Sequence, residues 1–253
     1  MKRALLALLL NLVCACAWAD TSRLDAILDG GSLRICTTGD YAPFTLQKAD
    51  GSFEGIDIDL ANALAKALGV RAQFVKTTWP TLMDDFLAHC DIAMGGISVT
   101  LERMKKAGYT EAHMIDGKSA IARCADTAKY QTLDDIDRET TRAIVNPGGT
   151  NERFARATLK HAQLNVYPDN VGIFQQLVNG HADIMLTDAS ETQWQAKLHP
   201  ELCAIHPERP FQYGEKAYLL PRGDTTFKAW VDTWMRLQKA NGDYQRVLDR
   251  WLQ

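Results

Sequence analysis

The chain lacks most of the patterns that mark common catalytic and binding centres. Its six histidines are scattered, and no C-x-x-C, H-E-x-x-H or G-x-S-x-G pattern and no phosphate-binding loop occurs in the 253 residues. These absences argue against a metal site, a serine-hydrolase elbow and nucleotide chemistry. With 28 Lys and Arg against 31 Asp and Glu, the net charge is -3, and there is no basic run. No nucleic-acid partner is therefore expected.

Long apolar runs are also scarce, and the one that occurs stands near the N-terminus. Two basic residues precede an apolar run over residues 4–13, and a small-x-small cleavage site ends at Ala19. This pattern predicts a secretory signal peptide over residues 1–19, too short to span a membrane. A lipid-accepting Cys14 or Cys16 is the alternative. No later segment is apolar enough for a span, so the mature protein is expected to be soluble and periplasmic, without a membrane partner.

Strand and helix patterns alternate through the mature chain in two similar series. The first has the order strand, helix, strand, helix, strand over residues 33–37, 59–68, 72–76, 80–88 and 91–95. The second repeats this order over residues 143–145, 150–160, 165–167, 170–179 and 182–186. An extended stretch and two helices follow over residues 217–220, 226–240 and 244–252. Each series predicts a mainly parallel sheet with helices on both faces.

Two such series in one chain predict an α/β protein of two lobes. One lobe is expected to comprise residues 20–117 and 216–253, and the other residues 118–215. Crossing strands near residues 116–122 and 212–219 would let the lobes hinge about a ligand. Because ligands gather at the carboxyl ends of strands in such sheets, residues that follow strands are the candidates for a site.

Four cysteines follow the predicted cleavage site, namely Cys36, Cys90, Cys124 and Cys203. Disulfides persist outside the cytoplasm, and four cysteines allow three connectivities. The strand pattern favours a bond between Cys124 and Cys203, because both lie in the second half on segments that flank one lobe. The sequence leaves the pairing state of Cys36 and Cys90 open, with two buried thiols as one interpretation. Metal ligation is the rival interpretation, but the spacing does not support it.

Residues 146–151 read as a strand that opens through two glycines into a helix N-terminus. The backbone N–H of Gly149 and the hydroxyl of Thr150 could receive a carboxylate there, helped by the helix dipole. Asn146 could donate its amide to the same ligand. The simpler interpretation is a turn with Thr150 as the N-cap, and the two interpretations are compatible.

Arg103 is a second candidate for binding an anion. It follows the strand over residues 91–95 and a polar loop that contains Ser98 and Thr100. A guanidinium there can hold a carboxylate by two parallel hydrogen bonds, with the two hydroxyls as further donors. Charged residues flank Arg103, however, so a solvated surface arginine is the alternative.

Asp188 and Glu191 follow the strand over residues 182–186, and their spacing places them on one face of a helix that starts there. Asp188 is a candidate for holding a substrate amine. Glu191 is a candidate general acid, because exclusion of water and an acidic neighbour both raise the pKa of a carboxyl group. The alternative is that Asp188 caps the helix and Glu191 complements its dipole.

Two aromatic residues complete the set of candidates. Trp79 and Tyr41 lie on loops that follow predicted strands. Either ring could stack on a planar ligand, and either could belong to the core of a lobe. Trp79 is favoured for the site because it lies on no evident apolar stripe.

Taken together, these stretches resemble the extracytoplasmic solute-binding proteins for polar amino acids over nearly the whole mature chain. The residues that carry this resemblance are 39–43, 55–59, 98–103 and 187–188. Other stretches resemble the cyclohexadienyl dehydratases, periplasmic enzymes built on the same fold: residues 78–80, 146–152, 187–189, 199–203 and 215–222. The resemblance implies a two-lobed periplasmic binding protein type II fold with two crossing hinge strands.

The resemblance to the dehydratases also implies an activity. The substrates would be prephenate, converted to phenylpyruvate, and arogenate, converted to phenylalanine, with loss of water and carbon dioxide and no cofactor. Glu191 then corresponds to the catalytic glutamate, Trp79 and Asn146 to the substrate pocket, and Cys124 with Cys203 to the disulfide.

The same resemblance leaves several points open. Arg103 would anchor one carboxylate and the helix start at Thr150 the other, whereas Asp188 would meet the amine of arogenate, which prephenate lacks. The glycine pair at residues 95–96 replaces a more usual serine-containing stretch, and the loop before Asp91 is one residue short. The alternative function is the amino-acid-binding component of an ABC importer. The oligomeric state is open, a homo-oligomer included.

Overall fold

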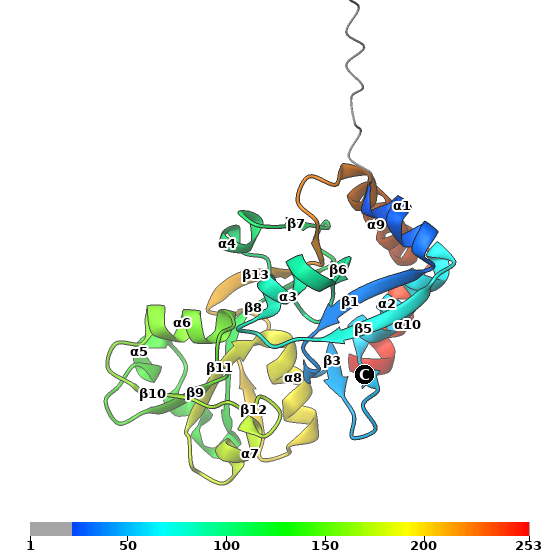
Figure 1. Ribbon diagram of the computed structural model, residues 1–253. Coiled ribbons are helices and arrows are strands. Elements are labelled where there is room, and N and C mark those ends of the chain that lie inside the picture. The colour runs from blue at the N-terminus through cyan, green and yellow to red at the C-terminus, as the bar shows by residue number, and fades with distance from the viewer. Residues whose placement is uncertain (1–21, 253) are drawn as a thin grey trace, which may run out of the picture.

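The computed structural model describes residues 22–252, which form two units of sheet and helix side by side (Figure 1). The predicted signal peptide over residues 1–19 and its alternatives at Cys14 and Cys16 lie outside the described residues. Within residues 22–252, no helix is both long and apolar enough to traverse a bilayer. The predicted alternation of strands and helices in two series is confirmed.

The first unit is built on a five-stranded sheet with the order β5-β1-β6-β14-β7. Its strands are β1 (Ser32–Thr37), β5 (Arg71–Lys76), β6 (Ile92–Ala93), β7 (Gly108–Tyr109) and β14 (Leu219–Leu220). β1 runs parallel to β5 and β6, whereas β14 is antiparallel to both β6 and β7. The sheet is therefore mixed, with the predicted parallel strands at one side. A small second sheet comprises β2 (Asp40–Tyr41), β3 (Thr45–Gln47) and β4 (Phe53–Glu54).

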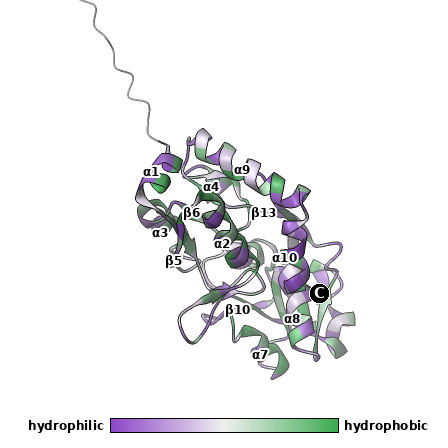
Figure 2. Ribbon diagram, turned by 90° about the vertical axis from the view of Figure 1, so that its right-hand side faces the viewer, coloured by the Kyte–Doolittle hydropathy of each residue, from purple (hydrophilic) through white to green (hydrophobic). Residues whose placement is uncertain are grey.

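The helices of this unit are α1 (Arg23–Gly30), α2 (Ile56–Leu68), α3 (Leu82–His89), α4 (Leu101–Met104), α9 (Thr225–Ala240) and α10 (Asp243–Leu252). Helix α2 forms because apolar residues recur every fourth position and are buried, at Ile56, Leu60, Leu64 and Leu68. It begins after Gly55, where φ is 132° and a Cβ would lie 2.3 Å from a backbone oxygen. Figure 2 shows α2 largely apolar and the outer α10 largely polar.

The second unit has the strand order β10-β9-β11-β8-β12, and β13 also pairs with β8. These strands are β8 (Met114–Arg123), β9 (Arg142–Val145), β10 (Gln163–Val166), β11 (Ile184–Asp188), β12 (Leu202–Ile205) and β13 (Gln212–Lys216). β10, β9 and β11 are parallel, and β8 is antiparallel to its partners. The helices are η1 (Cys124–Lys129), α5 (Leu133–Ile136), α6 (Thr150–Thr158), α7 (Ile173–Val178) and α8 (Ala189–Leu198).

The chain passes between the two sheets through the paired strands β8 and β13, in register from Met114 opposite Lys216 to Lys118 opposite Gln212. These are the two crossing segments expected from the sequence. The strands approach closely at Gly117, where a Cβ would lie 2.2 Å from the carbonyl oxygen of Gln212. The predicted lobe boundaries, at residues 117–118 and 215–216, fall inside these strands and stay a prediction.

Both pairs of cysteines form disulfides. The bond between Cys124 and Cys203 is confirmed, with Cα atoms 4.8 Å apart. The pairing state of Cys36 and Cys90, which the sequence left open, is also a disulfide rather than two thiols, with Cα atoms 5.7 Å apart. The reason is that Cys36 lies in β1 and Cys90 stands just before the adjacent parallel strand β6, within the separation that a disulfide needs. All four sulfur atoms are thus engaged, and the metal interpretation does not apply to them.

Candidate active site

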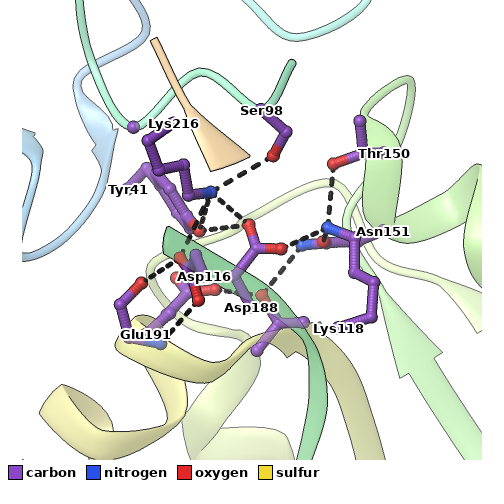
Figure 3. A network of polar contacts seen from close by, with 12 residues as sticks. Tyr41, Ser98, Asp116, Lys118, Thr150, Asn151, Asp188, Glu191 and Lys216 are labelled. Carbon is purple, nitrogen blue, oxygen red and sulfur yellow. Dashed lines mark hydrogen bonds and ion pairs between the residues drawn. The ribbon is translucent and has the colours of Figure 1, made fainter. Parts of the chain in front are cut away.

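Side chains from both units converge on Asp188, which ends β11 and precedes α8. Lys118 comes from β8, Lys216 from the end of β13, and Tyr41 from β2. All four residues are buried, with exposed fractions of 5% or less. Figure 3 shows the Asp188 carboxylate between the two lysine ammonium groups. The cluster therefore lies where the chain crosses between the sheets.

Asp188 has two cations as partners inside the protein. The Nζ of Lys118 lies 2.6 Å from Oδ1, and the Nζ of Lys216 lies 2.6 Å from Oδ2. The hydroxyl of Tyr41 also donates to Oδ2, at 2.5 Å. Burial alone would raise the pKa of Asp188, but the two lysine charges outweigh it and hold the pKa well below its usual value. Asp188 is therefore ionised and its charge is matched.

A second aspartate completes the balance of charge. Oδ2 of Asp116 lies 3.6 Å from the Nζ of Lys216 and accepts a hydrogen bond from the hydroxyl of Ser190 at 2.6 Å. Burial would lower the pKa of Lys216, but the charges of Asp188 and Asp116 outweigh it and raise the pKa above its usual value. Together with Lys118, the cluster has two lysines facing two aspartates, which leaves no net charge for a further carboxylate to neutralise.

Glu191, in the first turn of α8, is 1% exposed. Burial raises its pKa to about 8; a hydrogen bond from Thr187 opposes this shift, and the charge of Asp188 adds to it. The Thr187 hydroxyl donates to Oε2, while Oε1 is buried and has no hydrogen-bond partner within residues 22–252. At neutral pH the carboxyl group is therefore mostly protonated.

A path of hydrogen bonds joins Glu191 to the rest of the cluster. The amide of Asn151 donates to the Thr187 hydroxyl at 2.9 Å and to Oδ1 of Asn146 at 3.0 Å. The ammonium of Lys118 donates in turn to Oδ1 of Asn151. These hydrogen bonds fix the relative positions of four side chains, those of Glu191, Thr187, Asn151 and Lys118. A change of charge at Glu191 therefore changes the polarisation of the hydrogen bonds that lead to Lys118.

The helix start predicted to bind an anion is present, with a different cap. Gly149 rather than Thr150 is the N-cap of α6, and Thr150 is its first residue. The hydroxyl of Thr150 accepts from the Nζ of Lys118 at 2.8 Å. The backbone N–H of Gly148 is taken by Oε2 of Glu152 at 2.6 Å. At this turn the Gly148 N–H is therefore occupied, and the Thr150 hydroxyl is bound by an ammonium.

A small cavity between the units gathers most of the predicted residues. Its volume is about 10 Å³, which is too small for a six-membered ring, so the lobes must separate to admit one. The predicted residues that line it are Tyr41, Trp79, Ser98, Asn146, Gly149, Thr150 and Asp188. The rings of Tyr41 and Trp79 meet edge to face at 5.4 Å. We call this space the inner cavity.

Three predicted residues do not line the inner cavity. Arg103 lines a neighbouring outer cavity of about 210 Å³, and one of its guanidinium nitrogens donates to the carbonyl oxygen of Ser98 at 2.8 Å. The hydroxyl of Thr100 accepts from the Arg103 backbone N–H at 3.2 Å and so caps α4. Glu191 does not line the cavity either, and its Oε2 accepts from the hydroxyl of Thr187.

Sequence reasoning missed Lys118, Lys216, Asp116 and Asn151. The two lysines stand in the segments that were predicted to cross between the lobes, and a lysine in a strand with buried neighbours such as Ala120 is a signal that was available. Their partners could not be found from the sequence, because Asp188 lies 70 residues after Lys118 and 28 before Lys216.

Comparison with known proteins agrees with this geometry. Residues 33–253 match the model of the bacterial extracellular solute-binding proteins, family 3. The chain is 50% identical to the cyclohexadienyl dehydratase of Pseudomonas aeruginosa over 249 residues, which cover 98% of this chain and 92% of that protein. It is 26% identical to the L-cystine-binding protein TcyJ of Escherichia coli over 93% of this chain and 88% of that one.

Two solved structures of reconstructed ancestral proteins are also similar. One is an amino acid-binding protein described as a precursor of cyclohexadienyl dehydratase, with a TM-score of 0.85 and 32% identity over 92% of this chain and all of that one. The other is an ancestral cyclohexadienyl dehydratase, with a TM-score of 0.58 and 48% identity over 92% of this chain and 97% of that one. This chain belongs to the bacterial extracellular solute-binding proteins of family 3.

Proposed function

We propose that this protein is a cyclohexadienyl dehydratase that works in the periplasm after removal of its signal peptide. It converts prephenate to phenylpyruvate and arogenate to phenylalanine, with loss of water and carbon dioxide and without a cofactor. The observation that carries the proposal is the Glu191 carboxyl group, which is buried, has a pKa raised to about 8 by burial, and keeps one oxygen without a partner in the described chain. A solute-binding site has no need of such an acid.

Glu191 supplies the proton that the reaction consumes. The bond between the ring and its carboxylate breaks, and the electron pair completes the aromatic ring as carbon dioxide leaves. At the same time the bond from the ring to the hydroxyl breaks, and a proton from Oε1 of Glu191 turns the hydroxyl into water. Glu191 becomes a carboxylate and regains a proton from solvent when the lobes open.

Burial keeps Glu191 protonated until it is needed, because the neighbouring cations are already matched by aspartates. Asp188 and Asp116 already match Lys118 and Lys216, as the ion pairs at 2.6 and 3.6 Å indicate. An ionised Glu191 would add an unmatched negative charge to a buried cluster, which is costly. Closure of the lobes around a ring removes water and strengthens this effect.

The inner cavity provides partners for the rest of the substrate. Trp79 offers a face on which the ring can stack. The helix start at Thr150 attracts one carboxylate through the helix dipole, and the Thr150 hydroxyl, which accepts from Lys118, can donate its own proton to that carboxylate. Arg103, at the border with the outer cavity, holds the other by its free guanidinium N–H groups.

The partners of Asp188 explain how a substrate without an amine is handled. We expected Asp188 to meet the ammonium of arogenate, which prephenate lacks. Because Lys118 and Lys216 occupy both of its oxygens, Asp188 needs no cation from the substrate. Prephenate therefore binds without leaving a buried charge unmatched, whereas arogenate must compete with the lysines, so prephenate is the preferred substrate.

The decisive experiment is incubation of the mature protein with prephenate while phenylpyruvate is measured against the spontaneous rate. Turnover above that rate is expected. Its absence, in a folded protein that binds ordinary amino acids in calorimetry, would leave the alternative of an importer component. The alternative is favoured by the fold alone, whereas Glu191 and its environment favour the enzyme.

A further inference from the structure

Trp79 is a shared wall of the inner and outer cavities. The outer cavity, with a volume of about 210 Å³, is large enough for a carboxylate and part of a ring, whereas the inner one is not. Its walls include three cations from two units: Arg103, Lys106 and Arg153. A ligand that approaches the inner cavity past Trp79 therefore meets positive charge from both lobes.

The carboxylates of the outer cavity do not neutralise these cations. Asp84 and Glu102 line the same space. Even so, Arg103, Lys106 and Arg153 have no ion-pair partner within 4.0 Å among residues 22–252. Three cations against two unpaired carboxylates leave an excess of one positive charge, and the cationic side chains keep their N–H donors for a ligand.

The two arginines line the same outer cavity, Arg103 from the first unit and Arg153 from the second. Arg103 is 6% exposed, and one of its guanidinium nitrogens donates to the carbonyl oxygen of Ser98. Burial lowers the pKa of Arg103, and the positive charge of Arg153 lowers it further, so the two groups repel each other. An anion placed between them would convert this repulsion into attraction.

We propose that the outer cavity is an entry subsite for a dicarboxylate, where Arg153 and Lys106 join Arg103 in receiving a carboxylate before the ring passes Trp79 into the inner cavity. This inference rests on the proposed function, because prephenate carries two carboxylates. The subsite concentrates the dianion at the mouth of the cleft. It also favours closure only when an anion lies between the lobes.

The test is the kinetics of Arg153→Gln with prephenate. KM should rise about fivefold, as for loss of one exposed charge contact, while kcat stays within about twofold because the chemistry is untouched. The decrease of kcat/KM with added salt should be less steep than in the wild type, and at about 0.5 M salt the two proteins should converge. Lys106→Gln should behave in the same way.

Arg138→Gln is the matched control, since Arg138 is an exposed arginine of the same unit that pairs with Asp135 and does not line the cavity. It makes the same change in net charge and should leave KM and the salt dependence unchanged. Equal salt slopes for Arg153→Gln, Arg138→Gln and the wild type would overturn the subsite. A loss confined to kcat would overturn it as well.

Binding separates this inference from the proposed function. The association rate of prephenate is followed by the change in tryptophan fluorescence, which requires no turnover. A wild-type protein that binds prephenate without converting it would refute the dehydratase function, while slower association in Arg153→Gln would still support the subsite. If the wild type converts prephenate, and prephenate associates equally fast with the wild type and with Arg153→Gln, the subsite alone is refuted.

Discussion

The hydroxyl of Thr187 donates to Oε2 of Glu191, four residues further along the chain, while Oε1 is buried without a partner among residues 22–252. Thr187 is the residue before the last in β11 and Glu191 lies in the first turn of α8, so the bond spans the junction of strand and helix. The acid is thereby oriented by its own local sequence. The burial that keeps it neutral comes from the rest of the fold.

Replacement of Glu191 by glutamine should abolish most turnover of prephenate. Glutamine preserves the size of the side chain and can still accept from Thr187, but it has no acidic proton to give. We expect kcat to fall by about 10²-fold or more, with product binding retained in calorimetry. Glu201→Gln is the control, because Glu201 is an exposed glutamate of the same unit. A Glu191→Gln rate near that of the wild type would remove Glu191 from the mechanism.

Activity should decrease at alkaline pH. Glu191 acts in its protonated form, and burial raises its pKa to about 8. The value of kcat should therefore be constant at neutral pH and fall tenfold per pH unit above that pKa. A pH profile of kcat measured at saturating prephenate checks this. A profile that rises through pH 8 would indicate that Glu191 acts as a base instead.

Glu191 should also make stability depend on pH. Its pKa is about 8 in the folded protein, against the ordinary value of 4.5 for a glutamate in an unfolded chain. Between these values the folded state binds a proton that the unfolded state has lost, so the free energy of unfolding falls as pH rises through this window. The stabilising contribution of Glu191 is fully present below the unfolded pKa of 4.5 and is lost once the pH exceeds the folded pKa of about 8. Urea titrations at several pH values should show this slope in the wild type and a shallower one in Glu191→Gln.

Removal of the Lys216 charge should change the preference between substrates. In Lys216→Gln, Asp188 keeps Lys118 but loses the cation at Oδ2, and the ammonium of arogenate can take that place. We expect kcat/KM for prephenate to fall by about tenfold or more, since breaking a buried pair is costly, and the value for arogenate to fall less. Lys66→Gln, at an exposed lysine, is the control. Equal losses for both substrates would show that Lys216 does not select between them.

The two disulfides should differ in their contribution to stability. Their sequence separations of 54 and 79 residues give similar losses of unfolded-chain entropy, about 4 kcal/mol each in the chain-entropy model. Cys36 and Cys90 are also buried, at 0% and 4% exposure, so alanine at both positions leaves a cavity as well. Thermal unfolding should therefore show a larger loss for the double replacement of Cys36 and Cys90 than for that of Cys124 and Cys203. The reverse order would contradict this.

The sequence by itself determined the series of strands and helices, because the apolar periodicity within each element is local. It also indicated the residues that follow strands, which is why Tyr41, Trp79, Asn146, Thr150 and Asp188 were found and line one cavity. The spacing between Asp188 and Glu191 also predicted that Glu191 lies in the first turn of a helix that follows the strand. These features depend on neighbours within a few residues, and such local patterns are visible in the sequence.

The tertiary structure alone decided which charges meet. Lys118, Lys216 and Asp188 come from three distant segments, and their ion pairs depend on the register of β8 with β11 and β13. The bond between Cys36 and Cys90 likewise depends on the adjacency of β1 and β6. Arg103 faces the outer cavity because of how the two units close. Such relations arise from strand register and the packing of lobes, which no local pattern in the sequence encodes.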